Sequence, residues 1–320
     1  MPDPTTTNLL GFFTAFRNRF YEGYTGTPSW WMQLAMTEPS DTSLNTYGWM
    51  DRLPAMREWI GARQVTEPIT QNRSVVNRHF EITSSIDADR FKDDQYGIYN
   101  NIVREHARQA AKRHDYNLAA LIETNPTCFD GQAYFSTAHP QDTSGQQSLV
   151  TYSNDLINLA LNPTNIGQVK TQMRNFRGRD GKPFNVRPTL LVVPPNLEEA
   201  AHVICQNDYY SPNQFGGSSQ QVGMSQNMYK GQFTYLVIPE LTHANTWYAF
   251  YQEGPIRGLL VQLRQEIQMQ FLVNPTDPNV FWQKEYAWGA DSRENYDVTL
   301  PWYGVRCGVA LDGGTAGGPA

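Results

Sequence analysis

Hydrophobic positions near the amino end of the chain recur with the spacing of a helix. In residues 8–24 an apolar side chain returns every three or four positions, and Thr7 or Asn8 can cap the first turn. The apolar positions are Leu9, Phe12 or Phe13, Phe16 and Phe20. This pattern predicts a short amphipathic helix with one face available for packing.

Residues 54–82 follow a different pattern, in which apolar and polar residues alternate. The apolar positions are Val65, Ile69, Val75, Phe80 and Ile82. Glu67-Pro68 and Gln71-Asn72 offer the residues of turns, so we predict a long two-stranded arm. An isolated hairpin is marginal in water, so the apolar face of the arm needs a partner, most simply another copy of the same chain.

The helical period returns in residues 93–123 and continues for about thirty residues. Asp93 and Asp94 favour the positive end of a helix dipole, and Pro126 lies just beyond the other end. The predicted helix is a rod of roughly 45 Å. His106 and His114 lie two turns apart on it, too far to share a metal ion, so we expect packing or surface roles for both.

Residues 150–254 are predicted to form an α/β unit, and residues 255–308 return to strand-like sequence. In the first stretch we predict helices at 155–173 and 197–205 and strands at 189–193, 233–238 and 247–251. In the second stretch we predict strands at 259–267, 268–273, 281–288 and 297–309. Residues 208–232 are rich in Gly, Ser, Gln, Asn and Tyr and predict a loop.

Composition narrows the function classes. A chain of 320 residues with 40% hydrophobic content can form two compact subdomains. The net charge of −6 argues against a protein that grips phosphate backbones. No apolar run is long enough for a membrane span and no secretory signal is visible, so synthesis in the cytoplasm is expected. The three cysteines show no disulfide framework and no metal-ligand spacing, and we expect neither a metal nor a cofactor.

One cluster could support catalysis. Cys128, Asp130 and His139 lie within twelve residues, and a thiolate nucleophile needs a base and an orienting acid. No nucleophile elbow or protease signature surrounds the cysteine, and catalytic triads normally converge from separate segments. We therefore favour a buried structural role for Cys128 over a cysteine hydrolase that uses Cys128 and His139.

Several segments resemble the major head subunit of Mu-like phages, the gpT family. They are LAMTEPSDTSLNTYGWM (34–50), LPAMREWIGARQV (53–65), DDQYGIYNN (93–101), CFDGQAYFSTAHP (128–140) and KEYAWGADSR (284–293). The resemblance implies an α+β chain with the Hong Kong 97-type capsid fold. It implies an N-terminal arm (1–50), an extended β-hairpin loop (51–92), a peripheral domain with a long spine helix (93–152 and 255–311), an axial domain (153–254) and a flexible tail (312–320).

The implied function is structural: a major capsid protein, with no catalytic site, that assembles into the icosahedral shell around the double-stranded DNA of a Mu-like phage or prophage. Hexamers and pentamers of the chain, a separate scaffold, a maturation protease, portal proteins and possible decoration proteins are the implied partners, without sequence-specific DNA binding or a membrane. The alternative within the same fold is an encapsulin-type compartment. The protein is expected in the virion after synthesis in the bacterial cytoplasm.

Candidate interface residues are aromatic anchors and arginines that can pair with carboxylates across a subunit boundary. They are Phe12, Phe16 and Phe20 in the arm, Arg57, Glu58 and Trp59 at the base of the loop, and Arg63, Arg73 and Arg78 along it. The predicted loop contains arginines but no lysine before Lys92, so we expect no lysine-based cross-links between subunits.

Overall fold

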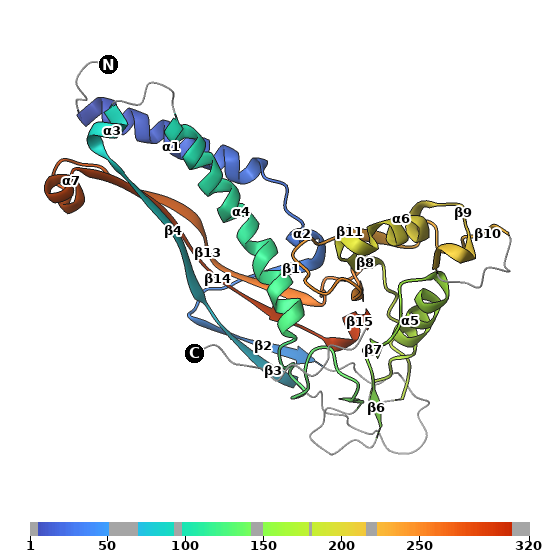
Figure 1. Ribbon diagram of the computed structural model, residues 1–320. Helices are drawn as coiled ribbons and strands as arrows, with labels where there is room; N and C mark the ends of the chain where they lie inside the picture. The colour runs from blue at the N-terminus through green and yellow to red at the C-terminus, as the bar shows by residue number, and fades with distance from the viewer. Residues whose placement is uncertain are drawn as a thin grey trace.

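Two β-sheets organise the chain, and one long helix packs against both of them (Figure 1). The computed structural model describes residues 6–50, 70–92, 98–141, 150–178, 181–215 and 223–308. The first sheet has the order β1 (Ala35–Pro39), β13 (Leu259–Leu272), β14 (Glu285–Val298) and β4 (Arg78–Asp87). The second has the order β11 (Thr234–Val237), β8 (Leu190–Val193), β12 (Trp247–Phe250), β15 (Gly304–Gly308) and β7 (Asp155–Ile157).

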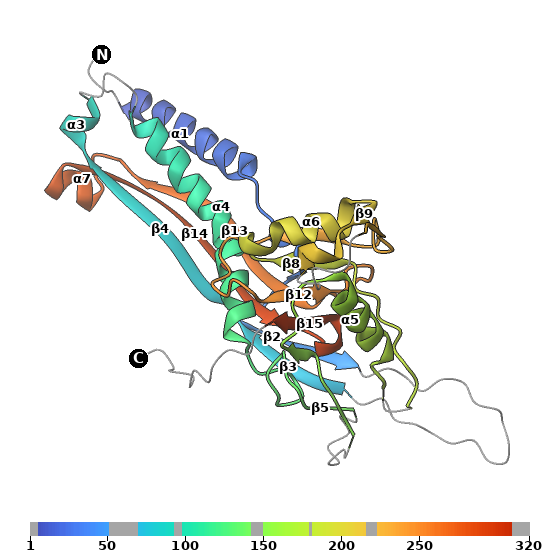
Figure 2. The ribbon, with the colours of Figure 1, turned by 45° about the vertical axis from the view of Figure 1, so that its right-hand side comes forward.

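The first sheet is built on a long hairpin. Strands β13 and β14 are antiparallel, β4 adds antiparallel to β14, and the short β1 adds parallel to β13. Helices α1 (Thr6–Gly26) and α4 (Ile98–Thr124) lie side by side along one face of this sheet (Figures 1 and 2). The 27 residues of α4 make a rod of roughly 40 Å.

The apolar face of α1 is buried against its own subunit. Phe13, Phe16 and Phe20 are at most 2% exposed, and they share a core cluster with Val103 and residues of both hairpin strands. Close approach of the two helices depends on Gly23, where an added Cβ would lie 3.0 Å from the Cβ of Ala107. The predicted amphipathic helix is therefore confirmed, and it packs on α4.

Strand β14 alternates regularly between a buried and a half-buried face. From Tyr286 to Tyr296 the even-numbered side chains are buried under the helices, and the odd-numbered side chains are less buried. A strand directs successive side chains to opposite faces, so one strand can contact two different layers. This alternation positions most of the polar contacts described below.

The second sheet is covered on both faces. Leu190, Val192 and Phe250 pack with Leu118 and Ile122 near the end of α4, whereas Leu191 and Val193 face helices α5 (Pro163–Asn175) and α6 (Glu198–Gln206). The central strands β8 and β12 are buried at every position, as expected for strands between two layers. Helix α4 thus joins the two sheets through separate halves of its length.

Shorter elements complete the described chain. They are α2 (Trp31–Leu34), β2 (Leu44–Met50), β3 (Thr70–Val76), α3 (Ala88–Lys92), β5 (His139–Pro140), β6 (Thr151–Tyr152), η1 (Pro195–Leu197), β9 (Tyr209–Tyr210), η2 (Pro212–Phe215), β10 (Ser225–Gln226), α7 (Pro278–Gln283) and η3 (Pro301–Tyr303). Across the described ranges, no helix combines the length and the apolar character that crossing a membrane requires.

The structure corrects the predicted pairing of the arm. Gln71 and Asn72 lie within β3 and do not form a turn, and β3 pairs with β2 while β4 pairs with β14. The alternating pattern was therefore a correct signal for strands, but their partners come from other parts of the chain. The rest of the predicted arm, residues 54–69, lies outside the described residues.

Three further predictions were wrong in part. Residues 281–288 begin in helix α7 instead of a strand, because Pro278 after Asp277 starts a helical turn. Residues 155–173 begin as strand β7, and the helix starts only at Pro163, capped by the side chain of Asn162. The last stretch divides between the two sheets, since β14 ends in the first and β15 belongs to the second.

Candidate functional site

Strands β2 and β3 form a separate antiparallel pair at one end of the first sheet (Figure 1). They are in register from Leu44 opposite Val76 to Met50 opposite Thr70. The chain between them contains Arg57, Glu58, Trp59 and Arg63, which lie outside the described residues. We call the β2–β3 pair the loop base.

An ion pair holds the loop base on the sheet. Arg73 of β3 donates to Asp297 of β14 through Nε, at 2.6 Å from Oδ2, and through Nη2, at 2.7 Å from Oδ1. The Asp297 side chain is 8% exposed and the Arg73 side chain 25%. A bidentate pair of this geometry fixes orientation as well as distance. The predicted interface residue Arg73 thus has a carboxylate partner in its own subunit.

A buried amide network adds to this attachment. Gln262 of β13, fully buried, accepts from the hydroxyl of Tyr47 at 2.8 Å and donates to Asn77 Oδ1 at 2.7 Å. Asn77 in turn donates to Ser40 Oγ at 2.9 Å. On the neighbouring strand, Asn295 donates to the carbonyl oxygen of Val76 at 2.7 Å. Each buried polar group in this chain of contacts has a partner, so the network can specify one position of the loop base.

A second ion pair joins α4 to the other face of β14. Arg113 donates to Glu294 at 2.6 Å from Nε to Oε1 and at 2.8 Å from Nη2 to Oε2. The Glu294 side chain has no solvent exposure, and the hydroxyl of Tyr296 also donates to it. Glu294 and Asp297 are three positions apart and so face opposite sides of the strand. Strand β14 therefore anchors α4 on one face and the loop base on the other.

His114 lies beside this pair and contacts both Tyr296 and Trp31. Its Nδ1 is 3.0 Å from the hydroxyl of Tyr296 and 3.6 Å from Glu294 Oε1, and its ring packs on Trp31 at 4.7 Å between centroids. Burial lowers the pKa of His114 below its usual value. His106, the other histidine of α4, contacts Ser84 Oγ at 3.0 Å. These contacts agree with the predicted packing roles.

Asp115 connects the same helix to the segment that follows α1. It is fully buried and accepts from Ser29 Oγ at 2.7 Å and from the backbone nitrogens of Trp30 and Trp31 at 3.1 Å each. Lys112 lies 3.3 Å away and supplies a positive charge. The carboxylate therefore satisfies backbone donors at the start of α2 and ties this segment to α4.

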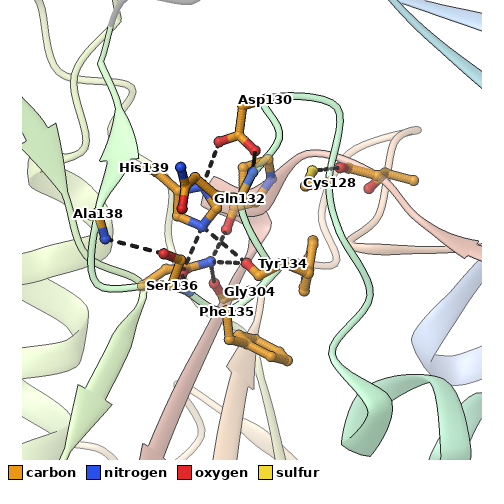
Figure 3. Close-up of polar contacts among 12 residues, drawn as sticks. Cys128, Asp130, Gln132, Tyr134, Phe135, Ser136, Ala138, His139 and Gly304 are labelled. Atoms are coloured by element: carbon orange, nitrogen blue, oxygen red, sulfur yellow. Dashed lines mark hydrogen bonds and ion pairs between the residues drawn. The ribbon is translucent and has the colours of Figure 1, made fainter. Parts of the chain in front are cut away.

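The Cys128 cluster has the geometry of a structural site (Figure 3). The Cys128 thiol, 3% exposed, donates to the carbonyl oxygen of Thr299 at 3.2 Å. Burial, with a smaller effect of Asp130, raises the pKa of the thiol to about 12. At neutral pH the sulfur is protonated and is a poor nucleophile.

His139 is also fully engaged in local contacts. Its Nδ1 lies 2.5 Å from Asp130 Oδ2, and its Nε2 lies 3.1 Å from both Tyr134 O and Asn154 Oδ1. Asn154 donates to the carbonyl oxygens of Tyr134 and Pro301 at 2.7 and 2.8 Å. The cluster thus fastens the loop after α4 to the end of the first sheet. In the described part of the chain, no group of three or more metal-ligating side chains is placed to hold a metal ion.

The other predicted interface residues differ in their surroundings. Phe16 and Phe20 are fully buried in their own subunit, Arg78 is exposed at the start of β4, and the side chain of Phe12 is not among those described. The anchors Arg113, Glu294, Asp115 and Asp297 were not predicted. Each charge is visible in the sequence, but nothing local indicates its partners in other elements, which are 84 to 224 positions away in the contacts given above.

Comparison with known proteins connects this architecture to one family. The family model described as "Mu-like prophage major head subunit gpT" matches residues 9–158, 157–241 and 230–307. The major capsid protein of Escherichia phage Mu is 35% identical over 154 residues, 47% of this chain and 50% of the relative. The FluMu major head subunit of Haemophilus influenzae is 29% identical over 161 residues, 48% of this chain and 52% of the relative. Each match thus spans about half of the relative's length.

The fold is that of tailed-phage capsid proteins. A chain from the procapsid of bacteriophage JBD30 superposes with a TM-score of 0.59 and 22% identity, over 97% of this chain and 77% of that one. This likeness establishes the α+β, Hong Kong 97-type fold. The family model matches nearly the whole described chain, and the family consists of structural proteins and not of enzymes. The chain therefore belongs to the Mu-like prophage major head subunit family, gpT.

Proposed function

We propose that this chain is the major capsid protein of a Mu-like phage or prophage and that it assembles into an icosahedral shell around double-stranded DNA. The observation that carries the proposal is the family match across residues 9–307. The chain-wide likeness to a procapsid subunit supports it. An encapsulin-type compartment has the same class of fold, but the family match favours a phage head.

The arrangement of the subunit suits this role. Residues 1–50 and 51–92 would serve as the N-terminal arm and the extended loop. Residues 93–152 and 255–311 would form the peripheral domain, and residues 153–254 the axial domain around five-fold and six-fold axes. The buried contacts of Arg73 and of the Gln262 network support a loop base that is held firmly on its own subunit. Such a base would present the loop to a neighbour at low entropic cost.

Residues near the loop would make the subunit contacts. Arg57, Glu58 and Trp59 are proposed at the base of the loop, with Arg63 further along and Arg78 at the exposed start of β4. Arg73 would contribute by fixing the loop base, because its guanidinium already pairs with Asp297. Aromatic side chains dominate interface energies, so Trp59 is the residue whose loss should matter most.

Other head components would act with the chain. We propose a separate scaffold, a maturation protease, a portal and possible decoration proteins as partners, with DNA packaged without sequence-specific contacts. The protein would be made in the bacterial cytoplasm and would function in the virion. The acidic net charge fits a shell that encloses DNA without gripping individual phosphates.

Expression with the cognate scaffold tests the proposal. Sedimentation and negative-stain images should show closed particles in the megadalton range, whereas a stable monomer under these conditions would contradict the proposed function. Trp59→Ala should fold normally, as judged by circular dichroism, and should lower the yield of particles. Cys128→Ala is the matched control, since a buried structural cysteine should not affect assembly beyond a small loss of stability.

A further inference from the structure

Helix α7 sits at the tip of the long β13–β14 hairpin, at the end of the first sheet opposite the loop base (Figure 2). It contains two of the most exposed large hydrophobic side chains among the described residues. Phe281 is 67% exposed and Trp282 is 78% exposed. Leu272, the last residue of β13, is 53% exposed. We call Leu272, Phe281 and Trp282 the tip patch.

The tip is held firmly by polar contacts with both strands. Asn279 donates to the carbonyl oxygens of Leu272 at 3.0 Å and Glu285 at 2.7 Å. Asp277 accepts from the backbone nitrogen of Asn274 at 2.8 Å, and Val280 packs against the core cluster under α1. The two exposed rings pack edge to face at 4.9 Å between centroids. The patch is therefore ordered before it meets a partner, which lowers the cost of binding.

The exposed apolar side chains of the tip patch are suited to contact with another apolar protein surface. None of the six residues of α7 is charged. From the fractions above, the two rings expose roughly 300 Å² of apolar surface, an area typical of functional patches on soluble proteins. Lys284, whose side chain is 74% exposed, directly follows the helix, so the aromatic pair is bordered by charge, as the polar rim of a protein interface borders its apolar centre.

The size of the patch indicates the kind of complex. A stable pair of proteins usually buries about 800 Å² on each partner, so the tip patch alone is too small to hold two subunits together. It can contribute when other contacts act at the same time, as in an assembly of many copies. The tip and the loop base lie at opposite ends of the sheet, so one subunit can contact different neighbours through each.

Resting on the proposed shell function, we propose that the tip patch is a contact between copies of this chain, with Phe281 and Trp282 as its anchors. The contact forms only in the assembled particle. In the free subunit both rings face solvent, and the patch is too small to hold two subunits together before the other contacts are available.

Thiol labelling gives a direct test. The native cysteines Cys128, Cys205 and Cys307 are at most 3% exposed, so Leu272→Cys, which lies in the tip patch and leaves both anchors in place, provides a selectively reactive thiol. A maleimide should label it rapidly in the free subunit and at least about ten-fold more slowly in particles assembled with the scaffold and then emptied of it, because interface cores exclude solvent. Equal rates in free subunits and emptied particles would overturn the proposal. Protection that disappears when the scaffold is removed would also overturn it, in favour of a scaffold contact.

An assembly assay makes the result independent of the label. The double variant Phe281→Ser/Trp282→Ser should keep the circular dichroism spectrum of the native subunit and lose most of its particle yield. Met224→Ser, which changes a side chain of similar exposure (69%) outside the tip patch, is the comparison variant. Normal yield from the folded double variant would refute the anchor role. If the unaltered chain itself forms no particles, the proposed shell function fails, and that outcome is distinct from failure at the tip.

Discussion

The Arg113–Glu294 pair should be the most sensitive polar contact between α4 and the first sheet. The change we consider is Glu294→Gln, which keeps the size of the side chain and removes its charge. The Glu294 side chain has no exposure and the Arg113 side chain only 16%, so the guanidinium would stay buried without a counter-charge. Breaking a buried pair in this way typically costs about 3–5 kcal/mol. Because Arg113 retains some access to water, we expect Glu294→Gln to lower the free energy of unfolding by about 3 kcal/mol, the lower end of this range.

The reciprocal variant should be more damaging. Arg113→Met leaves the Glu294 carboxylate fully buried, with the hydroxyl of Tyr296 as its remaining hydrogen-bond donor among the contacts described above. We expect a cost of about 4–5 kcal/mol, near the upper end of the range for broken buried pairs. The double variant should be less destabilised than the sum of the two single changes, because neither charge is then left alone.

Urea unfolding of the unassembled subunit, followed by fluorescence and circular dichroism, measures these differences. Arg108→Met is the matched control, since the Arg108 side chain is 67% exposed and its guanidinium lies 3.8 Å from the Glu105 carboxylate. Exposed pairs contribute about 0–1 kcal/mol, so its midpoint should barely move. A loss below about 1 kcal/mol for Glu294→Gln, or full additivity in the double variant, would refute the reasoning.

Three other predictions concern pH, thiol reactivity and cross-links. Burial lowers the pKa of His114, so the unfolded chain takes up a proton at about pH 6.5 while the folded chain does not. The stability of the subunit should therefore fall as the pH drops below about 6.5, and it should fall less in His114→Gln. Urea midpoints at pH 7.5 and 5.5 measure both effects. With its pKa raised to about 12, the Cys128 thiol should resist a disulfide reagent at pH 8 in the folded subunit and react on unfolding; rapid reaction in the native state would contradict the assigned burial. Mature particles boiled in denaturant should give one band near 36.4 kDa or a trimmed form, because the first lysine, Lys92, lies at the far end of the loop beside the long helix; a ladder resistant to reductant would contradict this.

Sequence periodicity was a reliable guide to the helices. The spacing of Phe16 and Phe20 predicts α1, and the long period before Pro126 predicts α4, because an amphipathic helix carries its packing face within one continuous segment. The same information could not distinguish α7 from a strand. Phe281 and Trp282 favour strands by composition, and Pro278 at the first helical position decided the outcome.

Partners between distant segments could not be predicted in this way. The alternation around Val75 indicates a strand, but β3 pairs with β2, which precedes the loop, and the sequence contains no turn that specifies this choice. The pair of Arg113 with Glu294 depends on a helix and a strand 181 positions apart. For the candidate site as a whole, residue types were informative, whereas the buried counter-charges became visible only when the chain was folded.

The two-sided role of β14 limits how this strand can change during evolution. Substitutions can alter one face without disturbing the other. A one-residue insertion or deletion within the strand would exchange the faces of every position that follows it, so Glu294 would turn toward the loop base and Asp297 toward α4. Both ion pairs would be lost in a single event. Length variation among related head subunits should therefore avoid this strand and accumulate in the connections between elements, even where the strand's residues themselves differ.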